Sequence, residues 1–268
     1  MVGNRKYEPE AGLAQDYIAV MAQLGIERCV LVQPSFYGTD HGCQIDAMHL
    51  IGVANCRGVA VIDEDIAAGE LRRLNDAGFR GVRFNLMSGG LPLHALEAVA
   101  NKIAPFNWHV QLFAASRAIE AVAPRLRALP VPVVIDHMGC PEKGRGLAQP
   151  GFHALLRLLA DQVAWVKLGG AERLSEQADG FDDVVPFARA LIAAAPNRVV
   201  WGLDWPPSRY YAAPPAPRDW IELLLKYTND PRRIRAILVD NPAALYDFPR
   251  PQLEATGNRD SATPIPPG

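Results

Sequence analysis

Several patterns that define whole classes of protein are missing from this chain of 268 residues. Its four cysteines have no CxxC spacing, which argues against a disulfide framework and against a cysteine metal site. Its six histidines form no HxH and no HExxH pair, the usual ligand patterns of a hydrolytic zinc centre. The residues therefore predict no bound cofactor.

The chain also has no block of like charge. Its net charge is -2, and acidic and basic residues are mixed along its length. This distribution predicts neither nucleic-acid nor membrane binding, and it leaves a small neutral or anionic molecule as the partner. No apolar run approaches the roughly 18 residues that span a bilayer, and the amino terminus lacks the basic-then-apolar order of a signal peptide. We therefore expect a cytoplasmic protein.

Hydrophobic residues are plentiful, at 49%, and they predict one large domain with a substantial core. Seven short apolar runs are typical of buried strands. They are Cys29 to Val32, Gly58 to Ile62, Gly81 to Phe84, His109 to Phe113, Val131 to Ile135, Ala164 to Leu168 and Val199 to Leu203. Helix-length stretches lie between them. This alternation predicts parallel strands joined by helical crossovers.

Polar residues follow nearly every one of these runs. They are Gln33, Ser35, Asp63, Arg83, Asn85, Gln111, His137, Lys167 and Asp204. In a (β/α)8 barrel such strand ends meet at one mouth, where the catalytic residues lie. A doubly wound open sheet would instead carry a glycine-rich phosphate loop, and no GxGxxG or Walker pattern is present. We therefore predict a distorted (β/α)8 TIM barrel.

The number of strands is one short of a closed barrel, which needs eight. We expect the first strand to be missing, so that residues 1–248 form an N-terminally incomplete barrel. Residues 249–268 are rich in Pro, Ser, Thr and Gly and are expected to form a disordered tail. Unpaired strand edges at the gap would favour a homodimer.

Two residues at the mouth are candidates for acid–base chemistry. Residues two apart on a strand face the same way, so His137 shares a face with Ile135, and Asp204 shares one with Gly202. If both faces point into the barrel, the Asp204 carboxylate could take a proton from water while the His137 imidazole polarises a carbonyl. A buried structural histidine and a turn aspartate remain the alternative.

Further residues suggest that the mouth binds an anion. Arg83 and Asn85 share a strand face that rises to it, and Arg173 follows the sixth apolar run. The planar guanidinium group suits a carboxylate, although surface salt bridges are the alternative for both arginines. Three more polar residues near strand ends complete the expected substrate-binding set: Ser35, Tyr37 and Gln111.

Five motifs, in this order along the chain, are similar to those of one known family: FRGVRFN, WHVQLF, VVIDHMG, WVKLGGAERLS and WGLDWPP. They resemble the amidohydrolase-2 branch of the amidohydrolase superfamily, and within it the 2-pyrone-4,6-dicarboxylate hydrolase (lactonase) group. The resemblance implies a distorted TIM barrel that hydrolyses a lactone, often without a metal. It also implies that Asp204 is the general base, that His137 helps to polarise the carbonyl, and that Arg83, Arg173 and Ser35 bind the substrate.

The chain departs from the family's pattern in three places. The family's HxH pair at the end of the first strand is absent, in line with the missing strand. Residues 86–90 contain no basic residue where the pyrone-dicarboxylate enzyme has one, which argues against a dicarboxylate substrate. The common DWPH ending is here Asp204-Trp205-Pro206-Pro207.

Our hypothesis is a metal-independent catabolic hydrolase that opens a carboxylate-bearing pyrone, a muconolactone or a sugar lactone. Two alternatives stay open. One is a zinc-dependent decarboxylase of the same superfamily, although His137 and Asp204 alone would be a weak zinc site. The other is a non-catalytic barrel that binds small anions.

Overall fold

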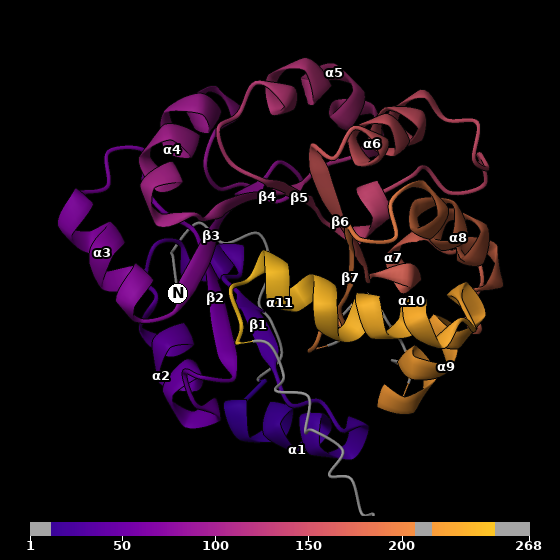
Figure 1. Cartoon of the computed structure of the whole chain (residues 1–268), viewed down its shortest axis with the longest axis horizontal. Helices are drawn as coiled ribbons and strands as arrows, with labels where there is room; N and C mark the ends of the chain where they lie inside the picture. Colours follow the sequence, from indigo (N-terminus) through magenta and orange to yellow (C-terminus); the bar gives the residue numbers. More distant parts are fainter. Residues whose placement is uncertain (1–11, 207–215, 250–268) are drawn as a thin grey trace, which may run out of the picture.

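The computed structural model describes residues 12–206 and 216–249. Within them, seven parallel strands form one sheet in chain order. They are β1 Cys29–Val32, β2 Cys56–Ala60, β3 Phe79–Asn85, β4 His109–Phe113, β5 Val133–Ile135, β6 Ala164–Leu168 and β7 Val199–Trp201. Figure 1 shows the sheet curled at the centre of the molecule with helices around its outside. The predicted parallel α/β architecture is confirmed, and β1 and β7 are the two edges of the sheet in these residues.

Helices follow the strands as predicted. They are α1 Ala14–Leu24, α2 Gly42–Ile51, α3 Ala68–Asp76, α4 Leu96–Ile103, α5 Ser116–Arg127, α6 Pro150–Ala160, α7 Ala171–Leu174, α8 Val185–Ala194, α9 Pro217–Tyr227, α10 Pro231–Arg235 and α11 Asn241–Leu245. Each long helix turns an apolar stripe to the sheet; in α5 it consists of Ile119, Val122 and Leu126. No helix in residues 12–206 or 216–249 is long and apolar enough to cross a membrane.

Four strands differ from the prediction by one or two residues at an end: β2, β3, β5 and β7. β5 begins at Val133 rather than Val131, because Pro132 has no N–H to give to a neighbouring strand. β2 ends at Ala60 because its pairing with β1 and β3 stops there. The predicted absence of a first strand concerns the start of the chain, where residues 1–11 lie outside the described part, and stays a prediction. The predicted tail also lies outside it, apart from Pro249.

Side chains alternate between the two faces of the sheet. Leu112 and Ile135 belong to the main hydrophobic cluster, between the sheet and the helices. Val134, Trp165 and Val200 form a separate small cluster inside the curl. Because residues paired across parallel strands share a face, the inward face of β5 is the one that carries Val134.

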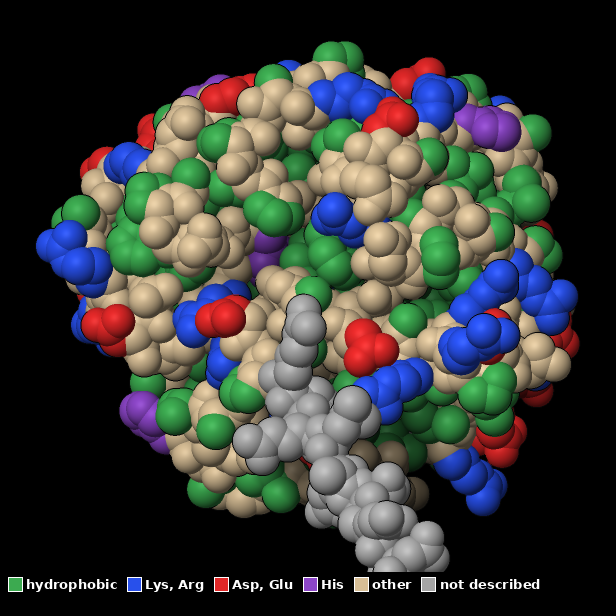
Figure 2. All heavy atoms as spheres, in the orientation of Figure 1, with side chains coloured by type: hydrophobic (Ala, Val, Ile, Leu, Met, Phe, Trp, Pro, Cys, Tyr) green, Lys and Arg blue, Asp and Glu red, His purple; other side chains and the backbone are tan. Residues whose placement is uncertain are grey.

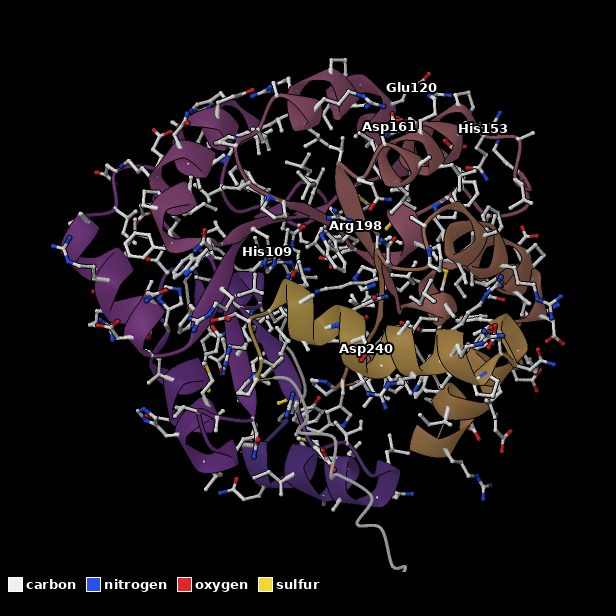
Figure 3. All side chains as sticks on the ribbon, viewed as in Figure 1. His109, Glu120, His153, Asp161, Arg198 and Asp240 are labelled. Atoms are coloured by element: carbon white, nitrogen blue, oxygen red, sulfur yellow. The ribbon has the colours of Figure 1, made fainter. Side chains whose placement is uncertain are left out.

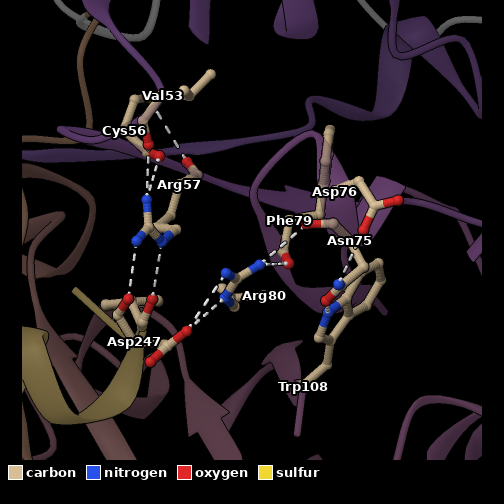
Figure 4. Close-up of polar contacts among 10 residues, drawn as sticks. Val53, Cys56, Arg57, Asn75, Asp76, Phe79, Arg80, Trp108 and Asp247 are labelled. Carbon is tan, nitrogen blue, oxygen red and sulfur yellow. Dashed lines mark hydrogen bonds and ion pairs between the residues drawn. The ribbon is translucent and has the colours of Figure 1, made fainter. Parts of the chain in front are cut away.

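The C-terminal helices α10 and α11 cross the end of the sheet where the strands begin (Figure 1). Arg57, on β2, donates hydrogen bonds of 2.8 to 3.2 Å to the carbonyl oxygens of Val53, Cys56, Tyr246 and Asp247 (Figure 4). Arg80, on β3, pairs with the Asp247 carboxylate at 3.3 Å. Asn241 donates to the carbonyl oxygen of Val199 at 2.7 Å. This end of the sheet is therefore closed, and the mouth lies at the other end.

The interior between these two ends is filled by side chains. His109, which Figure 3 labels near the centre of the ring of strands, is 1% exposed, and its ring meets that of Tyr246 at 5.4 Å. Burial lowers the pKa of His109 to about 3, so this imidazole is neutral. Figure 2 shows the outer surface on the closed side, where acidic and basic side chains are interspersed rather than collected in one block.

Candidate active site

The carboxyl ends of the strands bring together most of the side chains that the sequence singled out. They are Arg83 and Asn85 at the end of β3, Gln111 on β4, His137 after β5, Arg173 on α7 and Asp204 after β7. Their contacts form a buried group, which we call the floor and which centres on Asp136, and a partly exposed ion pair, which we call the rim and which consists of Arg173 and Asp204.

Asp136 organises the floor. Gln111 Nε2 donates to its Oδ2 at 2.9 Å, and Lys167 Nζ lies 3.1 Å from its Oδ1. Arg83 Nε lies 3.7 Å from Oδ2. Burial alone would raise the pKa of Asp136, but the charges of Lys167 and Arg83 outweigh it and lower the pKa to about 2. The floor is therefore an ionised carboxylate with two cations.

The inward face of β5 is the opposite of the one expected. Asp136 points into the curl with Val134, whereas Ile135 packs toward the helices. The prediction that His137 shares an inward face with Ile135 is wrong. His137 still lies at the mouth because the strand ends at Ile135 and the chain turns, with a left-handed φ of 49° at His137.

The His137 imidazole is held tightly by its surroundings. Its ring meets the Phe113 ring edge-on, with centroids 4.8 Å apart. A Cβ on Gly170, where φ is 74°, would lie 2.4 Å from His137 Nδ1, so this position requires glycine. Burial lowers the pKa of His137, and the charges of Asp204 and Asp136 offset this only in part. The imidazole is therefore neutral at pH 7.

The rim is an ion pair between residues 31 apart in sequence. Arg173 Nε donates to Asp204 Oδ2 at 2.7 Å, and the two side chains are 27% and 28% exposed. Asp204 has a φ of 54°, in the left-handed region that non-glycine residues adopt uncommonly. Burial alone would raise the pKa of Asp204, but His137 and Arg173 lower it below its ordinary value. Asp204 is therefore an ionised carboxylate within reach of solvent.

Glu172 lies beside this pair, on α7. Its Oε1 is 3.5 Å from Arg173 Nε, and its side chain is 3% exposed. Its Oε2 makes no hydrogen bond with any residue of the described part. Burial, reinforced by the Asp204 charge, raises the pKa of Glu172 to about 7. Arg173 therefore has two acidic neighbours, Asp204 and Glu172, and Glu172 is half-protonated near neutral pH.

The two expected hydroxyl residues lie on a 3-10 turn, Ser35–Tyr37, that follows β1. Asn85 Nδ2 donates to Ser35 Oγ at 2.7 Å, which ties this turn to the end of β3. Tyr37 packs against Phe36, with ring centroids 4.8 Å apart, and its hydroxyl interacts with Cys43. The structure therefore brings Ser35 to the other predicted residues, while the described contacts of Tyr37 lead away from them.

The charges at the site favour an anionic ligand. Arg83, Lys167 and Arg173 are cations, against the ionised carboxylates of Asp136 and Asp204 and the half-protonated carboxyl group of Glu172. Within residues 12–206 and 216–249, no group of three or more His, Cys, Asp or Glu side chains could hold a metal ion. These residues alone do not supply the three ligands that a catalytic zinc usually takes.

Three residues of the site were left out of the predicted site set, although Lys167 stands among the polar strand ends: Asp136, Lys167 and Glu172. Asp136 had a signal, because an acid that ends an apolar strand must find a partner when buried. Lys167 gave the same signal, because it is a charged residue near the end of an apolar strand. Glu172 had none, because an acid next to an arginine in a loop looks like an exposed ion pair.

Comparison with known proteins defines the class to which this site belongs. The amidohydrolase family model matches residues 1–248, and the chain belongs to this family of enzymes. The resemblance inferred from the five motifs is thereby confirmed.

Relatives within the family act on lactones, according to their names. The chain is 37% identical over 248 residues to a 4-sulfomuconolactone hydrolase of Hydrogenophaga intermedia, covering 90% of this chain and 82% of the relative. It is 34% identical over 255 residues to a 2-pyrone-4,6-dicarboxylate hydrolase of Comamonas testosteroni, covering 90% and 83%. A solved structure of a probable 2-pyrone-4,6-dicarboxylic acid hydrolase from Acinetobacter baumannii, with citric acid bound, matches with a TM-score of 0.82 and 26% identity, covering 92% of this chain and 94% of the other.

Proposed function

We propose that this enzyme hydrolyses a lactone that bears an anionic group, in the cytoplasm and without a metal cofactor. The observation that carries the proposal is the geometry at the mouth: Gly170 lies against both His137 and Arg173, and Arg173 pairs with Asp204 at 2.7 Å. Asp204 is ionised and partly exposed, whereas His137 is buried and neutral. Such a pair supplies both a proton acceptor and a hydrogen-bond donor, which hydrolysis of an ester requires.

In the proposed reaction, a water molecule attacks the lactone carbonyl carbon and Asp204 takes its proton. Neutral His137 donates a hydrogen bond to the carbonyl oxygen, on which negative charge develops. The bond between the carbonyl carbon and the ring oxygen then breaks, and the ring oxygen receives the proton held by Asp204. The product is a ring-opened acid, and Asp204 is again ionised.

The substrate's anionic group is assigned to the two arginines, Arg83 and Arg173. Guanidinium groups bind carboxylates through parallel hydrogen bonds, and the three cations at this site outnumber its two fully ionised carboxylates, Asp136 and Asp204. The names of the relatives support this choice, since one substrate carries a sulfo group and the other two carboxylates. The citric acid in the Acinetobacter neighbour is also a carboxylate. Three polar side chains are assigned to the remaining substrate oxygens: Ser35, Asn85 and Gln111. Tyr37 is left out of this assignment because its described contacts lead away from these residues.

A panel of lactones tests the proposal: pyrone dicarboxylate, muconolactone and neutral aldonolactones, each with and without a chelator. We expect turnover of an anionic lactone, slower turnover of the neutral ones, and no effect of the chelator. Activity lost to the chelator and restored by zinc would overturn metal independence. Turnover of no lactone at all, with retained binding of carboxylates, would replace the proposal with the anion-binding barrel. Size-exclusion chromatography of the same sample tests the predicted homodimer.

A further inference from the structure

Glu172 has no part in the reaction proposed above, and its surroundings are unusual for an acid. Its side chain is 3% exposed, and its Oε2 has no hydrogen-bond partner among the residues that the structure describes. A buried carboxylate without full hydrogen bonding destabilises the folded state. Such a group persists in proteins mainly where it acts on a site.

Two acids share one atom of Arg173. Its Nε lies 2.7 Å from Asp204 Oδ2 and 3.5 Å from Glu172 Oε1. A single N–H group can form a well-aligned hydrogen bond with one acceptor only, so the two carboxyl groups compete for it. In this structure, Arg173 Nε donates its short hydrogen bond to Asp204.

The backbone explains how Glu172 reaches this position. Gly170, with a φ of 74°, immediately precedes α7, which Ala171 begins and in which Glu172 and Arg173 are consecutive. Glu172 turns into the core near Tyr227 of α9: burial raises the pKa of this phenol, and the charge of Glu172 adds to the rise. Arg173 turns to the mouth instead.

We propose, resting on the function proposed above, that Glu172 is a positioning residue that sets the strength of Asp204 as a base by competing for Arg173 Nε. When Glu172 is protonated, the positive charge of Arg173 is directed at Asp204 and keeps this carboxylate a weak base. When Glu172 is ionised, Arg173 is shared between two carboxylates. Asp204 is then less stabilised as an anion, and it takes the proton of water more readily.

The charged and titratable groups around Glu172 allow its ionisation to be observed separately. They are Arg173 on its own helix, Asp204 after β7 and Tyr227 on α9. The pKa of Glu172 is about 7, whereas that of Asp204 is below its ordinary value and that of Tyr227 is above its own. His137, which also faces the rim, titrates below its ordinary pKa. A change centred near pH 7 is therefore the signature of Glu172.

The first experiment follows the ¹⁵Nε resonance of Arg173 by NMR as a function of pH, in the full chain. We expect an inflection near pH 7 in the unmodified protein and its loss in E172Q. Glu176 lies four residues further along the chain and is exposed, so E176Q serves as the matched control and should keep the inflection. An unmodified protein without this inflection, or an E172Q variant that keeps it, would overturn the proposal.

The second experiment compares kcat on an anionic lactone between pH 5.5 and 9. We expect kcat to rise by about three- to tenfold around pH 7 in the unmodified protein and in E176Q, because a stronger base accelerates proton removal. The rise should be absent in E172Q, whose kcat should stay near the low-pH value. A rise that survives in E172Q would overturn the proposal. If the unmodified protein hydrolyses no lactone, the proposed function fails, and the NMR titration still decides the competition for Arg173.

Discussion

Two arginines at opposite ends of the same sheet differ in what they bind. Arg57, at the closed end, uses all three guanidinium nitrogens on backbone carbonyl oxygens, at 2.8 to 3.2 Å. Arg83, at the mouth, makes a long bond of 3.4 Å to the Gln33 carbonyl and lies 3.7 Å from Asp136. Its Nε makes no hydrogen bond within the described part of the chain. Arg57 uses all three of its guanidinium nitrogens on the protein backbone, whereas Arg83 keeps N–H donors that could bind a ligand.

This difference shows how stability and function are divided between the two ends. At the closed end, backbone carbonyl groups solvate the charge of Arg57, and two of these bonds, to Tyr246 and Asp247, fix the C-terminal segment. At the mouth, charges pair with other side chains, and Arg83 is only loosely bonded; left-handed backbone occurs at both ends, at His137 and Asp204 and at Asp247. Incomplete pairing reduces stability, and it persists where a site needs groups held ready for a substrate.

The largest effect on the mouth should follow from removing the charge of Asp136. In D136N, Lys167 and Arg83 remain as buried cations without their counter-ion, so we expect the free energy of unfolding to fall by about 3–5 kcal/mol. Urea unfolding at pH 7 measures it. The exposed pair of Asp161 and Arg127, 2.7 Å apart, provides the control, and D161N should cost less than about 1 kcal/mol.

The pH dependence of stability sharpens this test. The pKa of Asp136 is lowered from 3.8 to about 2 in the folded protein, so its contribution is present above pH 4 and is lost as the pH falls toward 2. This contribution is about 2 kcal/mol. Unfolding curves of D136N should lack this part of the acid dependence. If D136N were as stable as the unmodified protein both at pH 7 and near pH 2, the stability of the floor would not depend on this charge.

Removing the charge of Asp204 should separate function from stability. We expect D204N to lower kcat on an anionic lactone at least a hundredfold, which is about 3 kcal/mol of barrier, with little change in the free energy of unfolding. Asp46 is exposed on α2, away from the strand ends, and D46N should leave kcat unchanged. Retained turnover in D204N would remove the proposed base from the mechanism.

The closed end should respond in the opposite way. R57M leaves four carbonyl oxygens without their donor, so we expect a loss of about 2–3 kcal/mol of unfolding free energy with kcat unchanged. R72M, which alters an exposed arginine on α3, is the control and should change neither quantity. If R57M instead lowered kcat at full stability, the division between the two ends would be wrong.

The smallest change tests how the His137 ring is held. In G170A, a Cβ at a φ of 74° would meet His137 Nδ1, so we expect a loss of about 1–2 kcal/mol of stability and a roughly tenfold lower kcat. Gly146 has a φ of 62° and nothing within 4 Å of its would-be Cβ. We therefore expect G146A to lose stability through backbone strain but to keep its kcat. Equal kcat values in the two variants would show that His137 does not depend on this contact.

Local patterns in the sequence were enough for the parallel α/β architecture. Alternating apolar runs and helix-length stretches reflect side-chain burial along single elements, so they can be read without knowing the neighbours. The polar residues at the strand ends could be found for the same reason. The sequence by itself therefore determined that Arg83, His137 and Asp204 lie near the carboxyl ends of parallel strands.

Only the tertiary structure decided how these residues interact. Alternation along β5 does not say which face is inward, because that depends on pairing with Gln111 and Trp165 in the neighbouring strands. The burial of Glu172 and the bond between Arg173 and Asp204 join elements that are separate in sequence. Charge states at the site depend on these contacts, since burial and neighbouring charges set each pKa. Composition and spacing contain neither quantity, which is why the chemistry of the site emerged only from the fold.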